Sequence, residues 1–301
     1  MNYNIISNNQ KEYIDMYNNI LNNEKNWIKM DGGISNDVYS FDNKYIIKKL
    51  NKKNDNLFCN FSNFYKILKN LDTTLIIDDI NNIIIEKYIN GTILSNEIIF
   101  NKDFCSKIYN IIDNINIQDY EINKNNIIIE YITFLNNYII ENKLINDEYE
   151  IYKIFADTIL LDLNKNNDKL VFNHNDVQKY NILDINDNLY LIDYEYSGYT
   201  WKYFDHANFI VLLLNEFITS YNIIDSKNFN SEFDIDYYID FTIKKYNIEK
   251  SYLLNLMFIS SYTWFLWAIV KYHVKNDELY SIYIKQMLFI LEKLVSIQVI
   301  M

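Results

Sequence analysis

The chain has 301 residues, of which 50% are hydrophobic and 17% aromatic, so it can bury a sizeable core and is not intrinsically disordered. Its formal net charge of −12 argues against binding to nucleic acid backbones and favours a cationic ligand. Proline is absent, every basic residue is lysine and only four glycines occur, a bias typical of an AT-rich coding sequence, so the scarce residue types carry the most information.

The N-terminal part contains no apolar segment of signal-peptide length. The two cysteines, Cys59 and Cys105, show neither pairing nor metal-ligand spacing. We therefore expect a cytoplasmic protein whose cysteines are reduced. The first predicted element is a surface helix over residues 10–29.

A pair of glycines, Gly32 and Gly33, follows this helix and precedes Ser35 and Asn36. Glycine permits positive φ and lets the backbone approach a ligand closely. Paired glycines are also typical of an ordinary hairpin turn, and both interpretations stay open here.

Three strands are predicted next, over residues 45–50, 75–80 and 82–88. The first carries Lys48 and Lys49, whose side chains must point to opposite faces because strand side chains alternate. Only one of these two lysines can therefore face a given ligand.

Beyond residue 100 the pattern changes, because apolar residues recur at helical spacing from Asn101 to about Leu163. We expect a lobe boundary near residue 90. It separates a β-rich part, residues 1–89, from a mainly helical part, residues 90–301.

Two apolar strands then flank a polar loop containing His174, Asp176 and Asn181, and the second strand ends at Asp193 and Glu195. Phosphoryl transfer needs a carboxylate that accepts the acceptor's proton and oxygen ligands that hold Mg²⁺. Asp176 is the candidate base, and Asn181 and Asp193 are candidate metal ligands. A single Asn or Asp often only serves a turn, but this ordered set between two strands is more specific.

The segments HNDVQKYNIL (174–183) and LIDYEYSGY (191–199) resemble the choline/ethanolamine kinase family, which is also similar to aminoglycoside phosphotransferases. The resemblance implies an α+β, two-lobed protein-kinase-like fold that binds ATP and Mg²⁺ in the cleft between its lobes. It assigns catalysis to Asp176, His174 and Asn181, the metal to Asn181, Asp193 and Glu195, and acceptor binding to Asp176, Gln178 and Tyr196. We interpret His174 as a core histidine that orients the loop.

The resemblance also implies a nucleotide site in the N-terminal lobe. Its residues are Gly32, Gly33, Ser35 and Asn36 over the phosphates, Lys48 as their basic partner, and Glu86 and Tyr88 in the inter-lobe hinge. The family's lysine pairs with a helix glutamate, but the corresponding segment, residues 54–70, has no acid beyond Asp55. Another acid orients Lys48, or the lysine binds phosphate unpaired, or activity is low.

The segment after the metal loop, Phe204 to Asn208, is similar to a Phe-Asp-x-(Gly/Ala)-Asn segment of the family. Asp205 is expected to brace the catalytic loop by hydrogen bonds, with a helix N-cap as the alternative. Where the family places a glutamate after this segment, the chain has Leu212, and Glu216 follows one turn later. This departure leaves the choice between choline and ethanolamine open.

The uncharged segment 251–270 is nearly long enough to span a membrane, yet the polar residues in its middle favour a buried helix. It carries Trp264 and Trp267 on one side, and Tyr280 and Tyr283 follow at the same spacing. Aromatic rings attract quaternary ammonium groups, although core packing explains most such residues. The order WFLWAIV, then DELYSIY, resembles the choline-binding segment of choline kinases.

We therefore expect a kinase that phosphorylates the hydroxyl of a small cationic amino-alcohol, choline or ethanolamine, a reaction of phospholipid metabolism. The alternatives are a kinase of another hydroxylated amine, such as an aminoglycoside or a thiamine-like compound, and a catalytically impaired amine- or nucleotide-binding protein. Neither a nucleic-acid partner nor stable membrane insertion is expected, and a homodimer is left open.

Overall fold

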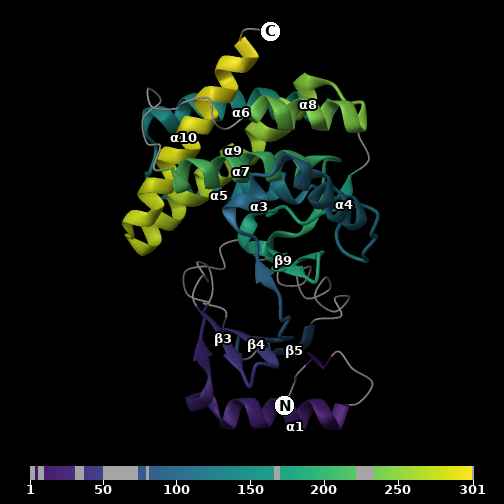
Figure 1. Ribbon diagram of the computed structural model, residues 1–301. Coiled ribbons are helices and arrows are strands. Elements are labelled where there is room, and N and C mark those ends of the chain that lie inside the picture. The colour runs from purple at the N-terminus through teal and green to yellow at the C-terminus, as the bar shows by residue number, and fades with distance from the viewer. Residues whose placement is uncertain are drawn as a thin grey trace. The chain divides into compact units, whose positions relative to one another are not determined.

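A computed structural model describes residues 4–5, 10–30, 37–49, 74–78, 81–165, 170–221 and 234–299. The chain divides into two units: unit 1 contains residues 1–91 and 120–122, and unit 2 contains residues 92–119 and 123–301. The described part of unit 1 contains a small antiparallel sheet and the helix α1, and unit 2 is mainly helical (Figure 1). The predicted α+β organisation, a small β-rich part and a larger helical part, is confirmed.

The elements of unit 1 form a six-stranded sheet in the order β1-β5-β6-β4-β3-β2, in which all pairs are antiparallel. Their bounds are β1 (Asn4–Ile5), α1 (Gln10–Asn22), η1 (Glu24–Asn26), β2 (Ile28–Lys29), β3 (Asp37–Phe41), β4 (Tyr45–Lys49), β5 (Thr74–Asp78) and β6 (Ile83–Lys87). The strands predicted over 45–50, 75–80 and 82–88 are confirmed as β4, β5 and β6. Asp42 and Asn43 both have positive φ between β3 and β4, as a tight hairpin turn requires.

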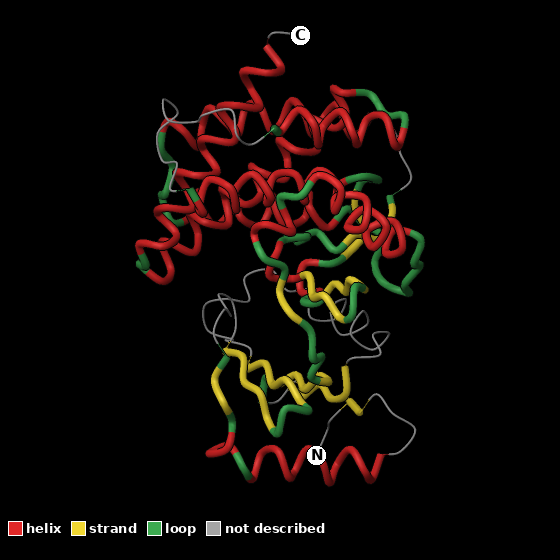
Figure 2. The backbone as a smooth tube through the Cα atoms, viewed as in Figure 1, coloured by secondary structure: helices red, strands yellow, loops and turns green. Residues whose placement is uncertain are grey.

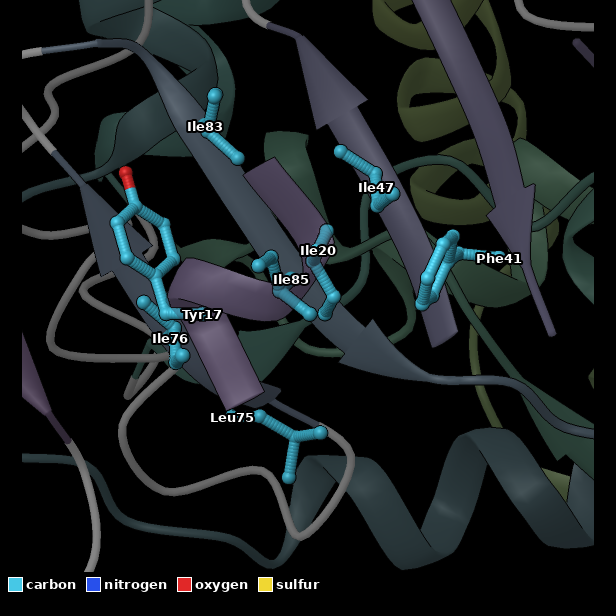
Figure 3. Packing of buried hydrophobic residues seen from close by; sticks show 8 residues of the cluster. All are labelled: Tyr17, Ile20, Phe41, Ile47, Leu75, Ile76, Ile83 and Ile85. Carbon is cyan, nitrogen blue, oxygen red and sulfur yellow. The ribbon is translucent and has the colours of Figure 1, made fainter. Parts of the chain in front are cut away.

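The core of unit 1 lies between α1 and the sheet (Figure 3). Tyr17 and Ile20 of α1 are buried against side chains from four strands, among them Ile47 and Ile85. The predicted surface helix is confirmed as α1, which buries one face and exposes the other, but its predicted end at residue 29 is wrong. The helix ends at Asn22 because the chain then turns through η1 into the extended strand β2, which pairs with β3.

Most of the buried core of unit 2 comes from its long helices, and shorter helices and strands lie between them in the sequence. The elements are β7 (Thr92–Ile93), α3 (Asn96–Ile99), η2 (Lys102–Phe104), α4 (Cys105–Asn116), α5 (Ile127–Glu141), α6 (Asp147–Lys165), β8 (Val171–Asn173), η3 (Lys179–Asn181), β9 (Ile182–Ile185), β10 (Asn188–Leu191), η4 (Tyr194–Tyr196), β11 (Gly198–Thr200), α7 (Phe204–Ser220), α8 (Ile235–Tyr246), α9 (Lys250–Lys275) and α10 (Glu278–Val299). Its strands form two small sheets, β10-β9-β7 and β11-β8 (Figure 2).

Helix α9 is the centre of unit 2 and packs against α5, α6, α7 and α10. It is apolar around most of its circumference, which is typical of a helix enclosed by others. Among the described residues it is the one helix long and apolar enough to cross a membrane, and 94% of its most apolar 18-residue window is buried. The predicted buried helix over 251–270 is confirmed.

Candidate active site

The polar loop that follows β8 begins with His174, which is fully buried. Its Nδ1 accepts the backbone N–H of Asp176 at 3.3 Å, and its Nε2 lies 2.9 Å from the carbonyl oxygen of Ile192. Because a carbonyl oxygen can only accept, Nε2 carries the proton and the imidazole is neutral. His174 thus connects the loop of Asp176 to the residue before Asp193, which agrees with its interpretation as a loop-orienting histidine.

The Asp176 carboxylate is bonded through one oxygen only. Its Oδ2 accepts hydrogen bonds from Nε2 of Gln178 at 2.9 Å and Nδ2 of Asn181 at 2.8 Å. Its Oδ1 is buried and has no hydrogen-bond partner among the residues that the structure describes. Burial raises the pKa of the carboxyl to about 7, and the nearby charge of Asp193 adds to the rise. Such a group can accept a proton from a bound ligand at neutral pH.

Asn181 and Asp193 offer oxygen atoms beside this carboxylate. Asn181 donates from Nδ2 to both the backbone oxygen and Oδ2 of Asp176, so its own Oδ1 takes no part in these bonds. Asp193 has φ 66° and ψ 66°, a left-handed conformation, and its negative charge acts on Asp176. Carboxylate and amide oxygens are the kinds of ligand that a hard divalent cation prefers. Glu195 follows in η4 and is half-buried.

No group of three His, Cys, Asp or Glu side chains in the described part of the chain is close enough to hold a metal ion by itself. Mg²⁺ commonly binds through one or two protein groups and completes its shell with water and substrate phosphate. The two oxygen donors here therefore fit a magnesium ion that arrives with a phosphate ligand.

The first turns of α7 hold the loop after β8 by hydrogen bonds to its backbone. Asp205 accepts the backbone N–H groups of His174 and Asn175, both at 2.7 Å, and Asn208 accepts that of Val177 at 2.9 Å. The predicted bracing role of Asp205 is confirmed. Burial raises the pKa of Asp205 to about 7, and the two backbone hydrogen bonds act in the opposite direction.

Asn208 is connected in turn to α9, since its Nδ2 donates to the hydroxyl oxygen of Ser260 at 3.0 Å. Both residues are completely buried. The sequence prediction missed this pair, because 52 residues separate its members. The signal in the sequence was weak, because Ser260 is one of several polar residues in this largely apolar helix.

Four of the predicted acceptor-binding aromatics lie together, joined through Trp267. Its ring centroid is 5.6 Å from Trp264, 5.6 Å from Tyr280 and 5.8 Å from Tyr283, and all three pairs are edge-to-face. Tyr196 from η4 joins the group at 5.3 Å from Trp264. Together these five side chains are called the aromatic cluster below.

The aromatic cluster lies next to the candidate base. Burial raises the pKa of the Tyr283 hydroxyl well above its ordinary range, and the charge of Asp176 adds to the rise. The indole N–H of Trp267 is buried without a hydrogen-bond partner among the described residues. The structure thus brings the predicted base and the predicted amine-binding rings into one neighbourhood of unit 2.

Glu216, the acid nearest in sequence to the family's missing glutamate, forms an ion pair. Its carboxylate lies 3.0 Å from Nζ of Lys179, and both side chains are 14% exposed. Lys179 also donates to the side chain of Asn96. No sequence pattern indicated this pairing, in which the Lys179 ammonium offsets the charge of Glu216.

In unit 1, Lys48 and Glu86 form an ion pair at 3.1 Å, with both side chains largely buried. Lys48 is paired in the sheet with Ile84, and Glu86 with Ile46, so the two charges are diagonal neighbours on one face. The sequence left open whether another acid takes the place of the missing helix glutamate beside Lys48. In the structure Glu86 is that acid. Glu86 lies in β6, the strand predicted over 82–88, and its assignment to a nucleotide-binding hinge stays a prediction.

Other predicted nucleotide-site residues are placed only in part. Tyr88 follows β6, is half-buried, and donates its backbone N–H to the carbonyl oxygen of Lys44 at 2.8 Å. Lys49 pairs with Glu24 at 3.6 Å and lies over the Trp27 ring. The remaining predicted elements lie outside the described residues: Gly32, Gly33, Ser35, Asn36, Cys59 and the helix 54–70.

Comparison with known proteins gives one family. The sequence model of the choline/ethanolamine kinase family matches residues 27–289. The fold is similar to an ethanolamine kinase from Plasmodium vivax (TM-score 0.67, 19% identity, 96% of this chain and 89% of that chain covered). It is also similar to a choline kinase from Streptococcus pneumoniae (0.70, 18%, 95% and 99%) and to an ADP-bound aminoglycoside phosphotransferase (0.53, 14%, 91% and 96%). No curated protein matches the chain.

Proposed function

Because the chain belongs to the choline/ethanolamine kinase family, and so to the small-molecule phosphotransferases, we propose that it transfers the γ-phosphoryl group of ATP to the hydroxyl of choline. The observation that carries this proposal is the position of Asp176. Its carboxylate has one buried oxygen without a partner among the described residues, and it is near enough to the aromatic cluster for its charge to raise the pKa of Tyr283. A base and a site for an organic cation are thus adjacent.

In the proposed reaction, Oδ1 of Asp176 accepts the hydroxyl proton of choline. The alcohol oxygen forms a bond to the γ-phosphorus while the bond from that phosphorus to the bridging oxygen of ADP breaks, so that phosphocholine and ADP leave. Gln178 and Asn181 hold Oδ2 of Asp176 through hydrogen bonds of 2.9 and 2.8 Å, which fixes the direction of Oδ1. The alcohol is therefore aligned before the proton moves.

Charge on the phosphates must be offset during transfer. When bound, magnesium supplies that positive charge, and the oxygen atoms of Asn181 and Asp193 are the groups that would hold it. In unit 1 the Lys48 ammonium, kept in place by Glu86, is the group that we propose for the nucleotide phosphates.

Choline is favoured over ethanolamine by the chemistry of the aromatic cluster. A quaternary ammonium needs no hydrogen-bond acceptors and is attracted by ring faces, whereas a primary ammonium brings three N–H groups that must be satisfied. Glu216 is already paired with Lys179, so its carboxylate is not available to a primary amine. A polycationic aminoglycoside needs several carboxylates around its pocket, and the rings of the cluster do not supply them.

The proposal is tested by ADP formation with Mg²⁺ and ATP against choline, ethanolamine and an aminoglycoside at matched concentrations. We expect kcat/KM to be highest for choline. A higher value for ethanolamine or for the aminoglycoside would assign another acceptor to the same chemistry. ATP binding without turnover of any acceptor would mean that the protein only binds its ligands.

The aromatic cluster is tested separately by Trp264→Ala. We expect the KM for choline to rise roughly tenfold with little change in kcat, because the ring contributes binding in ground state and transition state alike. The matched control is Tyr190→Ala, because Tyr190 is an exposed aromatic residue of β10. Trp201→Ala is unsuitable as a control because Trp201 is buried in the core. Unchanged kinetic parameters in the Trp264 variant would remove the cluster from the acceptor site.

A further inference from the structure

The short turn η3 lies between two side chains that hold the proposed base. Gln178 precedes the turn, Asn181 ends it, and both donate to Oδ2 of Asp176. Two backbone hydrogen bonds close the turn, from Asn181 to Gln178 and from Ile182 to Lys179. A single 3₁₀ turn has poor hydrogen-bond geometry and is weak by itself. The positions of the two side chains therefore depend on what holds η3 from outside.

The hydrogen bonds from the first turns of α7 hold the part of the loop that precedes this turn. Asp205 accepts the backbone N–H groups of His174 and Asn175, and Asn208 accepts that of Val177. All three of these N–H groups come before η3 in the chain. These bonds fix the start of the loop, and η3 is held by the other end of the same helix.

Lys179 is the residue of η3 that makes this second contact. Its ammonium lies 3.0 Å from Oε1 of Glu216 in the last turns of α7, and it donates to Oδ1 of Asn96 at the start of α3. Nδ2 of Asn96 donates to the Ser220 hydroxyl at 2.8 Å, and that hydroxyl donates to Oε1 of Glu216 at 3.4 Å. The four side chains form a closed ring of polar contacts that joins η3, α3 and α7, called the Lys179 bracket below.

The ion pair in the Lys179 bracket is largely removed from water. Its two side chains are 14% exposed, whereas those of the surface pair Lys102 and Asp234 are 46% and 47% exposed. Burying two charges is costly, so such a pair is weak evidence for added stability. Nor is it needed to connect the two helices, because the bond from Asn96 to Ser220 already joins α3 to α7. What the pair provides is a defined position for η3.

We propose that Lys179 and Glu216 are positioning residues for the proposed reaction, because they hold η3 in place. With η3 held, Gln178 and Asn181 keep the Asp176 carboxylate aligned toward the alcohol. This assignment rests on the proposed function, since it concerns the alignment of that base. Neither member of the ion pair belongs to the aromatic cluster, so loss of the pair should lower kcat and leave the KM for choline nearly unchanged.

Single and double substitutions separate positioning from packing. Lys179→Met leaves the Glu216 carboxylate buried without its charge partner, so this variant should lose stability, and its kcat should fall roughly tenfold or more. Lys179→Met combined with Glu216→Met removes both charges, so stability in urea should return to near the wild-type value. The kcat of the double variant should stay low, because η3 is still unanchored. Recovery of kcat together with stability would overturn the proposal.

A conservative variant and a remote ion pair are the controls. Lys179→Arg keeps a positive charge opposite Glu216, so its kcat should stay within a few-fold of the wild-type value. Lys153→Met removes an ammonium that lies 2.6 Å from Asp157 within α6, and it should change neither kcat nor the KM for choline. A loss of kcat in Lys153→Met equal to that in Lys179→Met would assign the effect to net charge and would overturn the proposal.

Hydrogen exchange, measured by mass spectrometry, tests the Lys179 bracket without any acceptor. The backbone N–H groups of Asn181 and Ile182 donate within η3, so a peptide covering 177–183 should exchange roughly fivefold faster or more in Lys179→Met and in the double variant. An unchanged exchange rate would mean that Lys179 does not hold η3, and the proposal falls. If the wild-type chain phosphorylates no acceptor, the proposed function fails, and the exchange rates still decide whether the Lys179 bracket holds the turn.

Discussion

Asp176 owes its chemistry to an imbalance between its two oxygens. Two side-chain amides hold Oδ2, and no described residue bonds to Oδ1. Burial and the charge of Asp193 both favour the protonated form, which is why the pKa of the carboxyl rises to about 7 from an ordinary 3.8. A base with this environment is strong enough to take a proton and still ionised over part of the neutral range.

A pH dependence of the reaction follows. Only the ionised carboxylate can accept the alcohol proton, so kcat/KM for choline should fall about tenfold for each pH unit below the pKa of Asp176. That pKa should lie above 3.8 and no higher than about 7, because a cation bound beside Asp193 removes part of the repulsion that raises it. Initial rates from pH 4 upward measure the acid limb. A profile that is flat down to about pH 4 would contradict the assignment of Asp176 as the base.

Lys48 and Lys49 are neighbours in sequence with different partners, which makes them a matched pair. Lys48 is held by Glu86 at 3.1 Å, whereas Lys49 lies against Trp27 and Glu24. We expect Lys48→Met to weaken ATP binding roughly tenfold or more, the worth of a charge-assisted hydrogen bond. Lys49→Met should change it little, and titration calorimetry with ATP measures both. Equal losses in the two variants would mean that net charge, not position, is responsible.

At the scale of elements, α9 contacts both parts of the proposed acceptor site, the loop of Asp176 and the aromatic cluster. Ser260 supports Asn208, which holds the backbone of Val177 in the catalytic loop, while Trp264 and Trp267 lie on the next turns. A shift of α9 would therefore move the aromatic cluster and loosen the catalytic loop together. This gives the buried Ser260 of a largely apolar helix a structural role.

The connection predicts different outcomes for two adjacent serines. Ser260→Ala leaves the buried Asn208 amide without its partner and should cost about 1–3 kcal/mol of unfolding free energy, with a lower kcat. Ser261 donates only to the carbonyl oxygen of Met257 in its own helix, so Ser261→Ala should be nearly neutral. For both variants, urea denaturation with an unchanged m-value measures the change in unfolding free energy, and initial rates measure the change in kcat. Equal losses of kcat in both variants would mean that the Ser260–Asn208 bond does not support the loop.

At the scale of the whole molecule, local patterns predicted what depends on local sequence. Strand alternation and apolar spacing predicted β4, β5, β6 and the buried helix α9, and the order of His174, Asp176 and Asn181 predicted a polar loop in which these side chains lie together. The strength of these predictions has a physical reason. Each of these features depends on residues within one element or on the loop next to it.

Pairings that depend on tertiary contacts were not predictable in the same way. Glu86 reaches Lys48 because of the register between β4 and β6, and that register is set by the whole sheet. Lys179 with Glu216, and Asn208 with Ser260, join segments 37 and 52 residues apart. The end of α1 at Asn22 was missed because apolar periodicity continues through Trp27 and Ile28, which belong to the next turn and strand.

The most direct test of the account is choline-dependent ADP formation by Asp176→Asn. The amide keeps the shape of the carboxylate but cannot accept the alcohol proton, so turnover should fall by about 10²–10⁴ while calorimetry still detects binding of choline and ATP. Asp187→Asn, at the exposed tip between β9 and β10, should leave turnover unchanged. Turnover within a few-fold of wild type in the Asp176 variant would contradict the central claim that this carboxylate is the base.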